Sequence, residues 1–303
     1  MQGTAGSVLG PGIAAISLGL VGHDVLAERL GRNQRFASIG GFMAAGLLGL
    51  TGYGLSTQAI FFASAALAVP TLFALTRIHA ADIHFARSCG AAESHPTRPE
   101  RASRIVLFKD RRLMTFAACL FLFQLANASI LPLLGERLAH AEGRWSSPVL
   151  SALILVPQII VAALAPWVGR TAASWGRKPL FLIGLGVVPL RSALFALTSD
   201  PALVVLIQVL DGLSGATLGV LTTLIIADLT KGTGRFNLAQ AVVGSLSAIG
   251  ASLSTSISGL VLQRFGDTAG FSSVTAVGLV AVAIPLVFMP ETKPLVLPPK
   301  PRA

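Results

Sequence analysis

Two charged residues lie deep inside long apolar stretches of the sequence. They are Arg191 and Asp211, which belong to two neighbouring apolar runs joined by a short turn. An ionisable side chain in such surroundings usually faces a cavity or a partner of opposite charge. Either Asp211 carries protons, with a pKa that responds to its surroundings, or it is a fixed counter-ion for Arg191. The sequence favours the ion pair, because an acid beside a permanent cation stays ionised.

Several uncharged amides also lie within the apolar runs. Each of them can line a path for a solute, or it can make an ordinary hydrogen bond between helices. Gln124 and Asn127 are one helical turn apart and would share a face. Gln208 lies one turn before Asp211, where it could complete the hydrogen bonds of Arg191. The candidates for a substrate or ion path are Gln124, Asn127, Gln158, Asp211 and Gln240.

Motifs of enzymes, metal sites and nucleotide sites are absent from the sequence. The two cysteines, Cys89 and Cys119, are far apart and have no histidine nearby, which disfavours a disulfide or a metal site. No Ser/His/Asp set, no G-x-x-x-x-G-K-[ST] phosphate loop and no metalloprotease motif occurs. We therefore predict no enzymatic activity, no cofactor and no metal, and an ATP-driven pump is disfavoured.

The chain that must position these residues is too apolar for a water-soluble domain. Hydrophobic residues make up 53% of its 303 residues, charged residues only 12%, and the mean hydropathy is +0.75; soluble domains carry about 25% charged residues. The net charge of +10 does not indicate nucleic acid, since the basic residues are spread over many loops. Nine apolar runs approach the roughly 20 residues of a membrane-spanning helix. They are Thr4–Val21, Phe36–Leu55, Gln58–Leu75, Leu113–Leu134, Pro148–Val168, Leu180–Leu197, Pro201–Ala227, Asn237–Leu262 and Gly270–Met289.

A short basic turn, Gly169–Leu180, separates two of these runs and orients all of them. Positive residues in short loops stay on the cytoplasmic side, so this turn is predicted to lie inside. Alternation then puts nineteen of the 23 Lys and Arg residues in inside loops and three in outside loops. The expected location is the inner membrane, with the C-terminus cytoplasmic and the N-terminus outside.

A weak internal repeat is visible when residue n is set beside residue n+200. Gly12 then pairs with Gly212, and the basic turn at Arg35 pairs with the one at Arg235. Spans one to three are therefore predicted to repeat spans seven to nine. The last six spans would form one complete half and the first three the second part of another half, with three helices missing at the front. Residues 77–112, which include eight basic residues, are predicted to be a solvated cytoplasmic linker.

The basic turn resembles the loop between helices eight and nine of the major facilitator superfamily, whose pattern is G-x-x-x-D-x-x-G-R-R/K. The position of the motif's Asp is occupied by Ala173. The Pro-Glu-Thr sequence at Pro290–Thr292 also resembles the family's exit from helix twelve. The matching positions, which would form a cytoplasmic gating turn, are Gly169, Gly176, Arg177 and Lys178.

The nine apolar runs and the resemblance together predict an all-α membrane protein with nine transmembrane helices. Residues 1–76 would be a partial N-terminal half, 77–112 the linker, 113–290 a complete six-helix half and 291–303 a cytoplasmic tail. The resemblance implies secondary active transport of a small organic solute by alternating access, most similar to proton-coupled drug and small-solute efflux, with the lipid bilayer, the solute and protons as partners. Two alternatives stay open: a truncated, transport-inactive product, and a membrane sensor or assembly partner.

Overall fold

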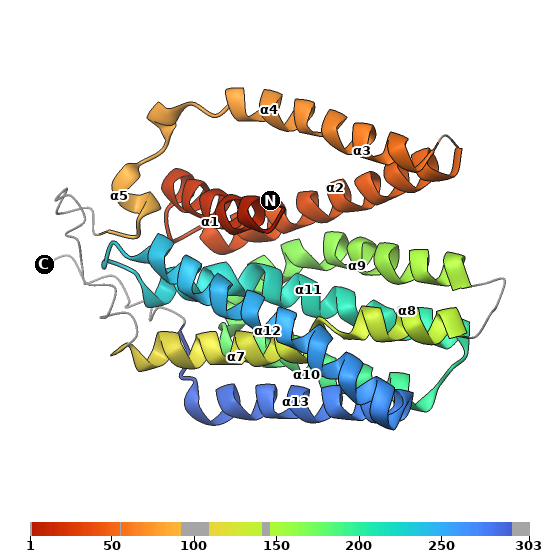
Figure 1. Ribbon diagram of the computed structural model, residues 1–303. Coiled ribbons are helices and arrows are strands. Elements are labelled where there is room, and N and C mark those ends of the chain that lie inside the picture. The colour runs from red at the N-terminus through yellow and green to blue at the C-terminus, as the bar shows by residue number, and fades with distance from the viewer. Residues whose placement is uncertain (1, 55, 92–108, 141–145, 293–303) are drawn as a thin grey trace, which may run out of the picture.

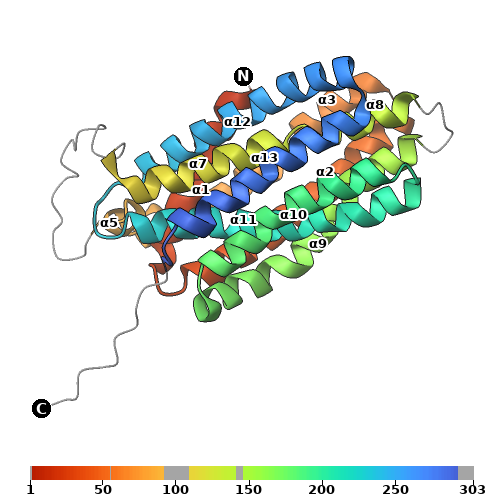
Figure 2. The ribbon, with the colours of Figure 1, turned by 90° about the horizontal axis from the view of Figure 1, so that it is seen from below.

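A computed structural model of the protein describes residues 2–54, 56–91, 109–140 and 146–292, which are largely helical (Figure 1). The long helices run side by side along one common direction (Figure 2). In chain order the helices are α1 (Gln2–Val21), α2 (Leu26–Gly54), α3 (Thr57–Ala66), α4 (Ala68–Thr76), the 3-10 helix η1 (Ala80–Asp82), α5 (Phe85–Ser88), α7 (Arg111–Asn127), α8 (Ile130–His140), α9 (Ser146–Trp175), α10 (Lys178–Leu197), α11 (Pro201–Leu229), α12 (Phe236–Phe265) and α13 (Asp267–Phe288).

The helices fall into a first group, α1 to α4, and a main bundle, α7 to α13. The first group joins the main bundle chiefly through α2, which packs along α9 and also contacts α11. The consecutive helices α3 and α4 lie at the edge (Figure 1), and α4 has no buried residue. We call the end where α1 ends and α7, α10 and α12 begin the basic end, because Arg111, Lys178, Lys231 and Arg235 lie there.

Seven helical segments of the described residues are long and apolar enough to cross a membrane. Neither α1 nor α2 is among them; in α1 the described side chains form the shorter apolar segment Leu9–Val21. The predicted count of nine spans, and with it the inference of three missing helices, is therefore not confirmed. The seven segments are Gln58–Thr76, Arg111–Leu138, Val149–Trp175, Lys178–Leu197, Pro201–Leu229, Phe236–Phe265 and Asp267–Phe288.

The first basic loop was predicted wrongly, because α2 begins at Leu26 and not at Phe36. Residues 26–35 contain several charged residues and were therefore predicted to be a loop. They form an amphipathic helix instead, in which Leu26 and Leu30 are buried four residues apart, the spacing of one helical face. Arg35 consequently lies inside a helix, whereas Arg235 precedes α12 as its N-cap residue. The two basic positions are not equivalent, so the proposed register of n with n+200 is wrong.

The predicted linker, residues 77–112, packs against both groups of helices over residues 77–91; its other described residues, 109–112, lead into α7, which begins at Arg111. The amide of His84 donates to the carbonyl of Gly19 in α1 at 3.3 Å, and the amide of Phe236 at the start of α12 donates to the carbonyl of Cys89 at 3.1 Å. Ser88 is buried. Most side chains of residues 77–85 are exposed, whereas those of residues 86–91 are half-buried or buried. The prediction of a solvated linker is therefore wrong for residues 86–91, and residues 92–108 lie outside the described part of the chain.

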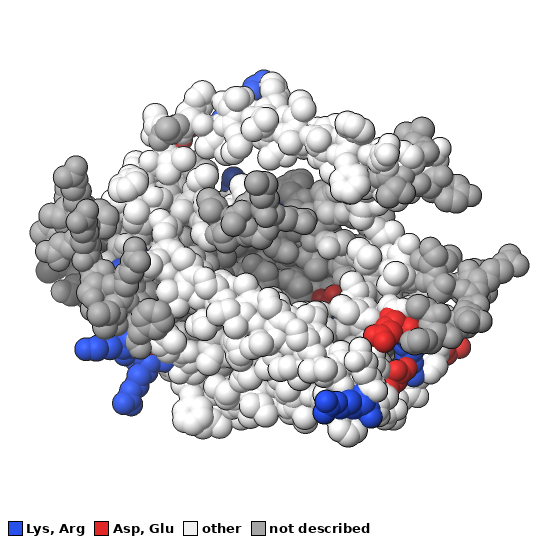
Figure 3. All heavy atoms as spheres, viewed as in Figure 1, with Lys and Arg blue, Asp and Glu red and all other residues white. Residues whose placement is uncertain are grey.

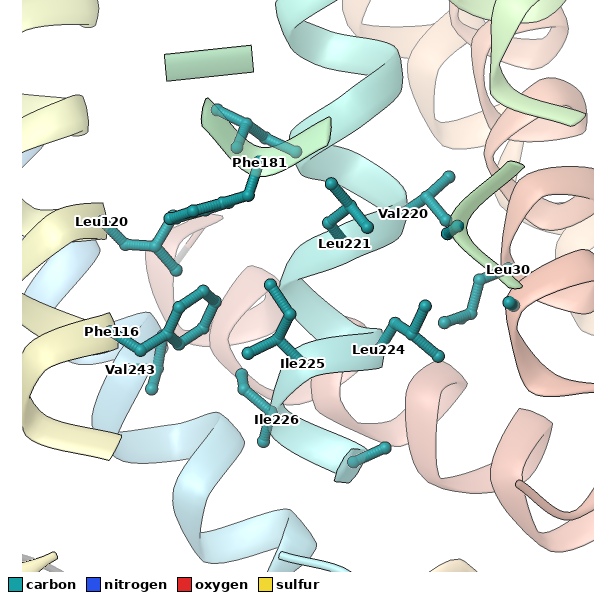
Figure 4. Packing of buried hydrophobic residues seen from close by; sticks show 14 of the residues in the cluster. Leu30, Phe116, Leu120, Phe181, Val220, Leu221, Leu224, Ile225, Ile226 and Val243 are labelled. Atoms are coloured by element: carbon teal, nitrogen blue, oxygen red, sulfur yellow. The ribbon is translucent and has the colours of Figure 1, made fainter. Parts of the chain in front are cut away.

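Two apolar clusters hold the main bundle together. The larger one surrounds α11 near the basic end, where Leu221 and Ile225 lie among side chains of α7, α10 and α12 (Figure 4). Phe116 and Phe181 contact each other there with ring centroids 5.3 Å apart. The smaller cluster lies towards the opposite end. Helices α7, α9, α10, α11 and α12 contribute to both clusters, and α11 is central because it contacts α2 and four helices of the main bundle, α7, α9, α10 and α12.

The contact between α2 and α9 depends on two glycines. A methyl group at Gly31 would lie 2.6 Å from the carbonyl oxygen of Ala165, and one at Gly169 would lie 2.5 Å from the carbonyl oxygen of Ala27. Real Cβ atoms do not approach backbone oxygens so closely. Small residues of this kind let two helix backbones pack tightly inside a membrane. Gly169 was assigned to the basic turn by the sequence, but it lies inside α9, and the connection between α9 and α10 is only Gly176 and Arg177. This glycine therefore joins the first group to the main bundle.

The first prediction tests this contact. Gly169→Ala should destabilise the folded protein by about 1–3 kcal/mol, because a rigid backbone carbonyl stands where the methyl group must go. Gly186→Ala in α10 is the matched control, since nothing lies within 4 Å of its added methyl group. Thermal unfolding of both variants in detergent gives the comparison. Equal melting temperatures for the two would show that the α2 and α9 backbones are not in close contact.

Candidate functional site

A polar cavity of about 540 Å³ lies between α2 of the first group and helices α7, α9, α11 and α12 of the main bundle. The space-filling view shows a hollow between the two groups, with acidic atoms inside it (Figure 3). All five residues predicted for a substrate or ion path line this cavity. They are Gln124, Asn127, Gln158, Asp211 and Gln240.

A helix break positions Asn127 at the cavity. The predicted span Leu113–Leu134 is in fact two helices, since α7 ends at Asn127 and α8 begins at Ile130. The break leaves backbone groups without helical partners, and these must find others in an apolar environment. Ser254 of α12 supplies one, because its hydroxyl accepts a 3.0 Å hydrogen bond from the amide of Ser129. The serines of α12 thus stabilise the bend in the α7–α8 segment.

Arg191 and Asp211 form an ion pair, as the sequence indicated. The guanidinium also donates to the side-chain oxygen of Asn127 at 2.5 Å and to that of Gln208 at 3.5 Å. Gln208 donates in turn to the carbonyl of Leu153 at 3.1 Å. Side-chain exposure is 2% for Arg191 but 28% for Asp211, so the cation is enclosed while its carboxylate partner reaches the cavity.

The second prediction concerns this pair. Asp211→Asn should lower the amount of folded protein in the membrane, because it leaves Arg191 without its counter-ion at a cost of about 2.5–3.5 kcal/mol. Adding Arg191→Gln should restore much of the loss, since no charge then remains to be neutralised. The measurement is the yield of monodisperse protein after extraction. The structural interpretation fails if the double variant is as poorly folded as the two single effects added together.

The basic turn holds a second buried ion pair. The Nε of Arg177 donates to Asp228 at the end of α11 at 2.9 Å, and its Nη1 donates to the carbonyl of Ala172 at 2.7 Å. The side chains of both ion-pair partners are less than 10% exposed. Asp228 thus supplies a carboxylate to this turn, in which Ala173 replaces the acid of the motif.

Glu291 of the Pro-Glu-Thr sequence also binds the basic turn. One of its oxygens accepts from the amide of Arg177 at 2.8 Å and the other from that of Lys178 at 3.1 Å. These amides open α10, where a carboxylate is favoured by the helix dipole. Gly176 has a φ of +107°, and a methyl group on it would lie 2.6 Å from Glu291. The resemblance pointed to this segment, but not to its contact with the turn.

The third prediction compares a buried pair with an exposed one. Asp228→Asn should destabilise the protein by about 3–5 kcal/mol, because it leaves the enclosed Arg177 unpaired. Asp267→Asn should cost at most about 1 kcal/mol, since Asp267 lies 3.7 Å from Arg137 and is 44% exposed. Thermal unfolding of the two variants, which both lose one negative charge, gives the comparison. A larger loss of stability for Asp267→Asn would contradict the conclusion that Asp228 and Arg177 form the buried pair.

The sequence prediction missed several residues that line the cavity. Gln34 and Ser38 of α2 were overlooked because the first of them fell in the basic stretch taken for a loop; they are four residues apart, the spacing of one helical face. Hydroxyl side chains within the apolar runs were not considered as candidates. The hydroxyl residues of the main bundle that line the cavity are Ser214, Thr222, Thr223 and Ser247.

Apolar helices of membrane-spanning length around a polar cavity are the arrangement of a polytopic membrane transporter. The family profile of the Major Facilitator Superfamily matches residues 116–303. Uncharacterised MFS-type transporters from two strains of Mycobacterium tuberculosis are each 36% identical over 294 residues, which is 96% of this chain and 70% of each relative. The class B tetracycline resistance protein of Escherichia coli is 35% identical over 107 residues, 35% of this chain and 26% of that protein.

The chain belongs to the Major Facilitator Superfamily. It is a multi-pass membrane protein, and the family membership indicates a transporter rather than an enzyme. The partial similarity to the tetracycline resistance protein is consistent with the drug-efflux branch.

Proposed function

We propose that this protein is a secondary active transporter that exports a small organic solute by alternating access. The observation that carries the proposal is the cavity of about 540 Å³, which is lined by residues of both helix groups. A site between two groups of helices is what an alternating-access transporter needs, because rocking of one group against the other exposes it to either side. The similarity to the tetracycline resistance protein supports export as the direction.

The chemistry of the cavity favours a neutral solute with several hydrogen-bonding groups. Its polar lining consists mainly of amides and hydroxyls, and Phe123 is its single aromatic residue among the described side chains. The charge of Asp211 is compensated by Arg191. A free cation or anion would therefore find no unpaired partner here, whereas amides can both donate and accept hydrogen bonds.

Proton coupling is the second part of the proposal, and Asp211 is the candidate carrier. Within the described part of the chain it is the ionisable residue that lines the cavity, and its carboxylate is partly accessible. A carrier role requires that Arg191 stays in place on Asn127 and Gln208 when the carboxylate is neutral. Normal folding of Asp211→Asn with loss of proton-coupled transport alone is therefore the result that would favour this role over that of a fixed counter-ion. The proposed location is the inner membrane, with the basic end and the C-terminus in the cytoplasm, because basic residues are retained there.

The fourth prediction tests transport. Proteoliposomes with an imposed proton gradient should move solutes from a panel of neutral polyhydroxyl and amide compounds more readily than cationic or anionic analogues of equal size. Gln240→Leu should reduce transport at least about tenfold, since a buried group that loses a good hydrogen bond costs about 1.4 kcal/mol or more. Gln263→Leu is the control, because Gln263 lies exposed near the other end of the same helix.

The possible results separate the proposal from its alternatives. Transport that persists unchanged in Gln240→Leu would remove the cavity as the solute site. Transport without any response to the proton gradient would remove the coupling but leave the site. A folded protein that moves no member of the panel would favour the alternatives of a transport-inactive product or a membrane sensor.

A further inference from the structure

We propose that residues 83–91 form a latch, which holds the basic end of the molecule closed and must release before that end can open. The latch lies between α1 of the first group and the turn that joins α11 to α12 in the main bundle (Figure 1). Opening of the basic end is part of the alternating access proposed above, so the latch rests on the proposed function. Its test needs no solute.

The two helix groups meet at the basic end and diverge towards the opposite end. The described side chains of α2 are buried only in its first part, between Leu26 and Ser38. The close backbone contact of α2 with α9, at Gly31 and Gly169, lies in the same part. Figure 1 shows α2 and α9 moving apart beyond it. The structure is therefore closed at the basic end, and access from that side requires the two groups to separate there.

The latch is hydrogen-bonded to both helix groups through its backbone. On one side the amide of His84 donates to the carbonyl of Gly19 in α1 at 3.3 Å. On the other side the carbonyl of Cys89 accepts a 3.1 Å hydrogen bond from the amide of Phe236, which begins α12. The neighbouring carbonyl in the latch, that of residue 90, accepts a second one at 3.3 Å from the amide of Gly234. One short segment is thus bonded to both groups.

The chain between the two sets of hydrogen bonds is too short to let the groups separate freely. It consists mainly of α5 (Phe85–Ser88), a single helical turn. A helix rises about 1.5 Å per residue, whereas an extended chain spans about 3.3 Å per residue. Movement of α1 away from the turn between α11 and α12 must therefore either unwind α5 or break one set of bonds. For this reason the latch opposes opening of the basic end.

Two glycines let the latch and its neighbours approach each other closely. A methyl group on Gly19 would lie 2.8 Å from the Cγ2 of Ile83 and 3.0 Å from the Cβ of Ser88. One on Gly90 would lie 3.2 Å from the Cβ of Phe236. Gly90 also has a φ of +75°, a conformation that glycine adopts without strain. Each side of the latch can therefore be disturbed by a single added methyl group.

The contacts that hold the latch can break while the bundle stays folded. They are largely backbone hydrogen bonds, and the largest apolar side chain of the latch, Phe85, is 71% exposed. No residue of the latch belongs to either of the apolar clusters found among the described residues. Segments with few buried apolar contacts open locally at a lower free energy than the core. The latch is thus built to release reversibly.

The experiment measures the distance across the basic end in the full chain with two spin labels. They are attached through Val25→Cys, just before α2, and Ala173→Cys near the end of α9, since both positions are exposed. Cys89→Ser and Cys119→Ala first remove the native thiols. Pulsed electron paramagnetic resonance then gives the distance distribution, which should be dominated by the short distance of the closed state.

Disturbing either side of the latch should populate a longer distance. Gly19→Ala and Gly90→Ala should each raise the population of the open state about fivefold, as expected when one or two backbone hydrogen bonds are lost. Gly12→Ala is the matched control within α1, and Gly22→Ala is the control for a positive φ, which is +70° there. Nothing lies within 4 Å of either added methyl group, so both controls should keep the closed distance.

Hydrogen exchange of the unmodified protein tests the latch without any variant that must fold. The amides of His84, Gly234 and Phe236, which bond the latch to its neighbours, should exchange faster than the amides in the middle of α11. They should also exchange together, because release of the latch exposes them in one step. Exchange as slow as that of α11 would mean that the latch does not release, and would overturn the proposal.

The distance measurements separate a latch from a purely structural contact. A structural contact would lower the melting temperature in Gly19→Ala and Gly90→Ala but leave the distances at lower temperature unchanged, and this result would overturn the proposal. An equal shift in the two controls would do the same. A shift confined to the latch variants supports the latch even if no solute of the panel is transported, so its failure and that of the proposed function are distinguishable.

Discussion

The close backbone contact between α2 and α9 is the constraint on which the arrangement of the whole chain depends. Gly31 and Gly169 allow it, because no side chain separates the two helices there. The contact attaches the first group of helices to the main bundle, and it brings Gln34 and Ser38 of α2 to the rim of the cavity. Beyond this contact, α2 and α9 both line the cavity. The close packing at the two glycines therefore sets the position of the cavity between the helices.

The main bundle contains two buried arginines, and each forms an ion pair with an aspartate. Arg191 and Asp211 pair within the bundle, and Arg177 and Asp228 pair at the basic end. In each set the arginine also donates to neutral oxygens, which is what an enclosed guanidinium with five N–H donors requires. The two sets differ in access: Asp211 reaches the cavity, whereas Asp228 is enclosed. The first is therefore accessible from the cavity, and the second fixes the basic turn.

Much of the site could be predicted because membrane burial makes polar residues conspicuous. Asp211, Gln124 and Gln240 are costly in apolar runs, and the cost alone marked them as cavity or partner residues. Gln34 gave no such signal, since it stands among arginines. The linker was also misjudged: its basic composition indicated solvent, but backbone hydrogen bonds, which composition does not reveal, dock it against α1 and α12.

The sequence by itself determined that the chain is helical and membrane-embedded, that its basic turn is a family motif, and that Arg191 requires an acid. These follow from local apolarity and from the cost of an isolated charge, which need no knowledge of neighbours. Only the tertiary structure decided that α2 starts before its charges, that Ser254 stabilises a break after Asn127, and that Glu291 closes onto the basic turn. The reason is that each of these is a contact between segments far apart in the chain, and such contacts depend on how whole helices pack.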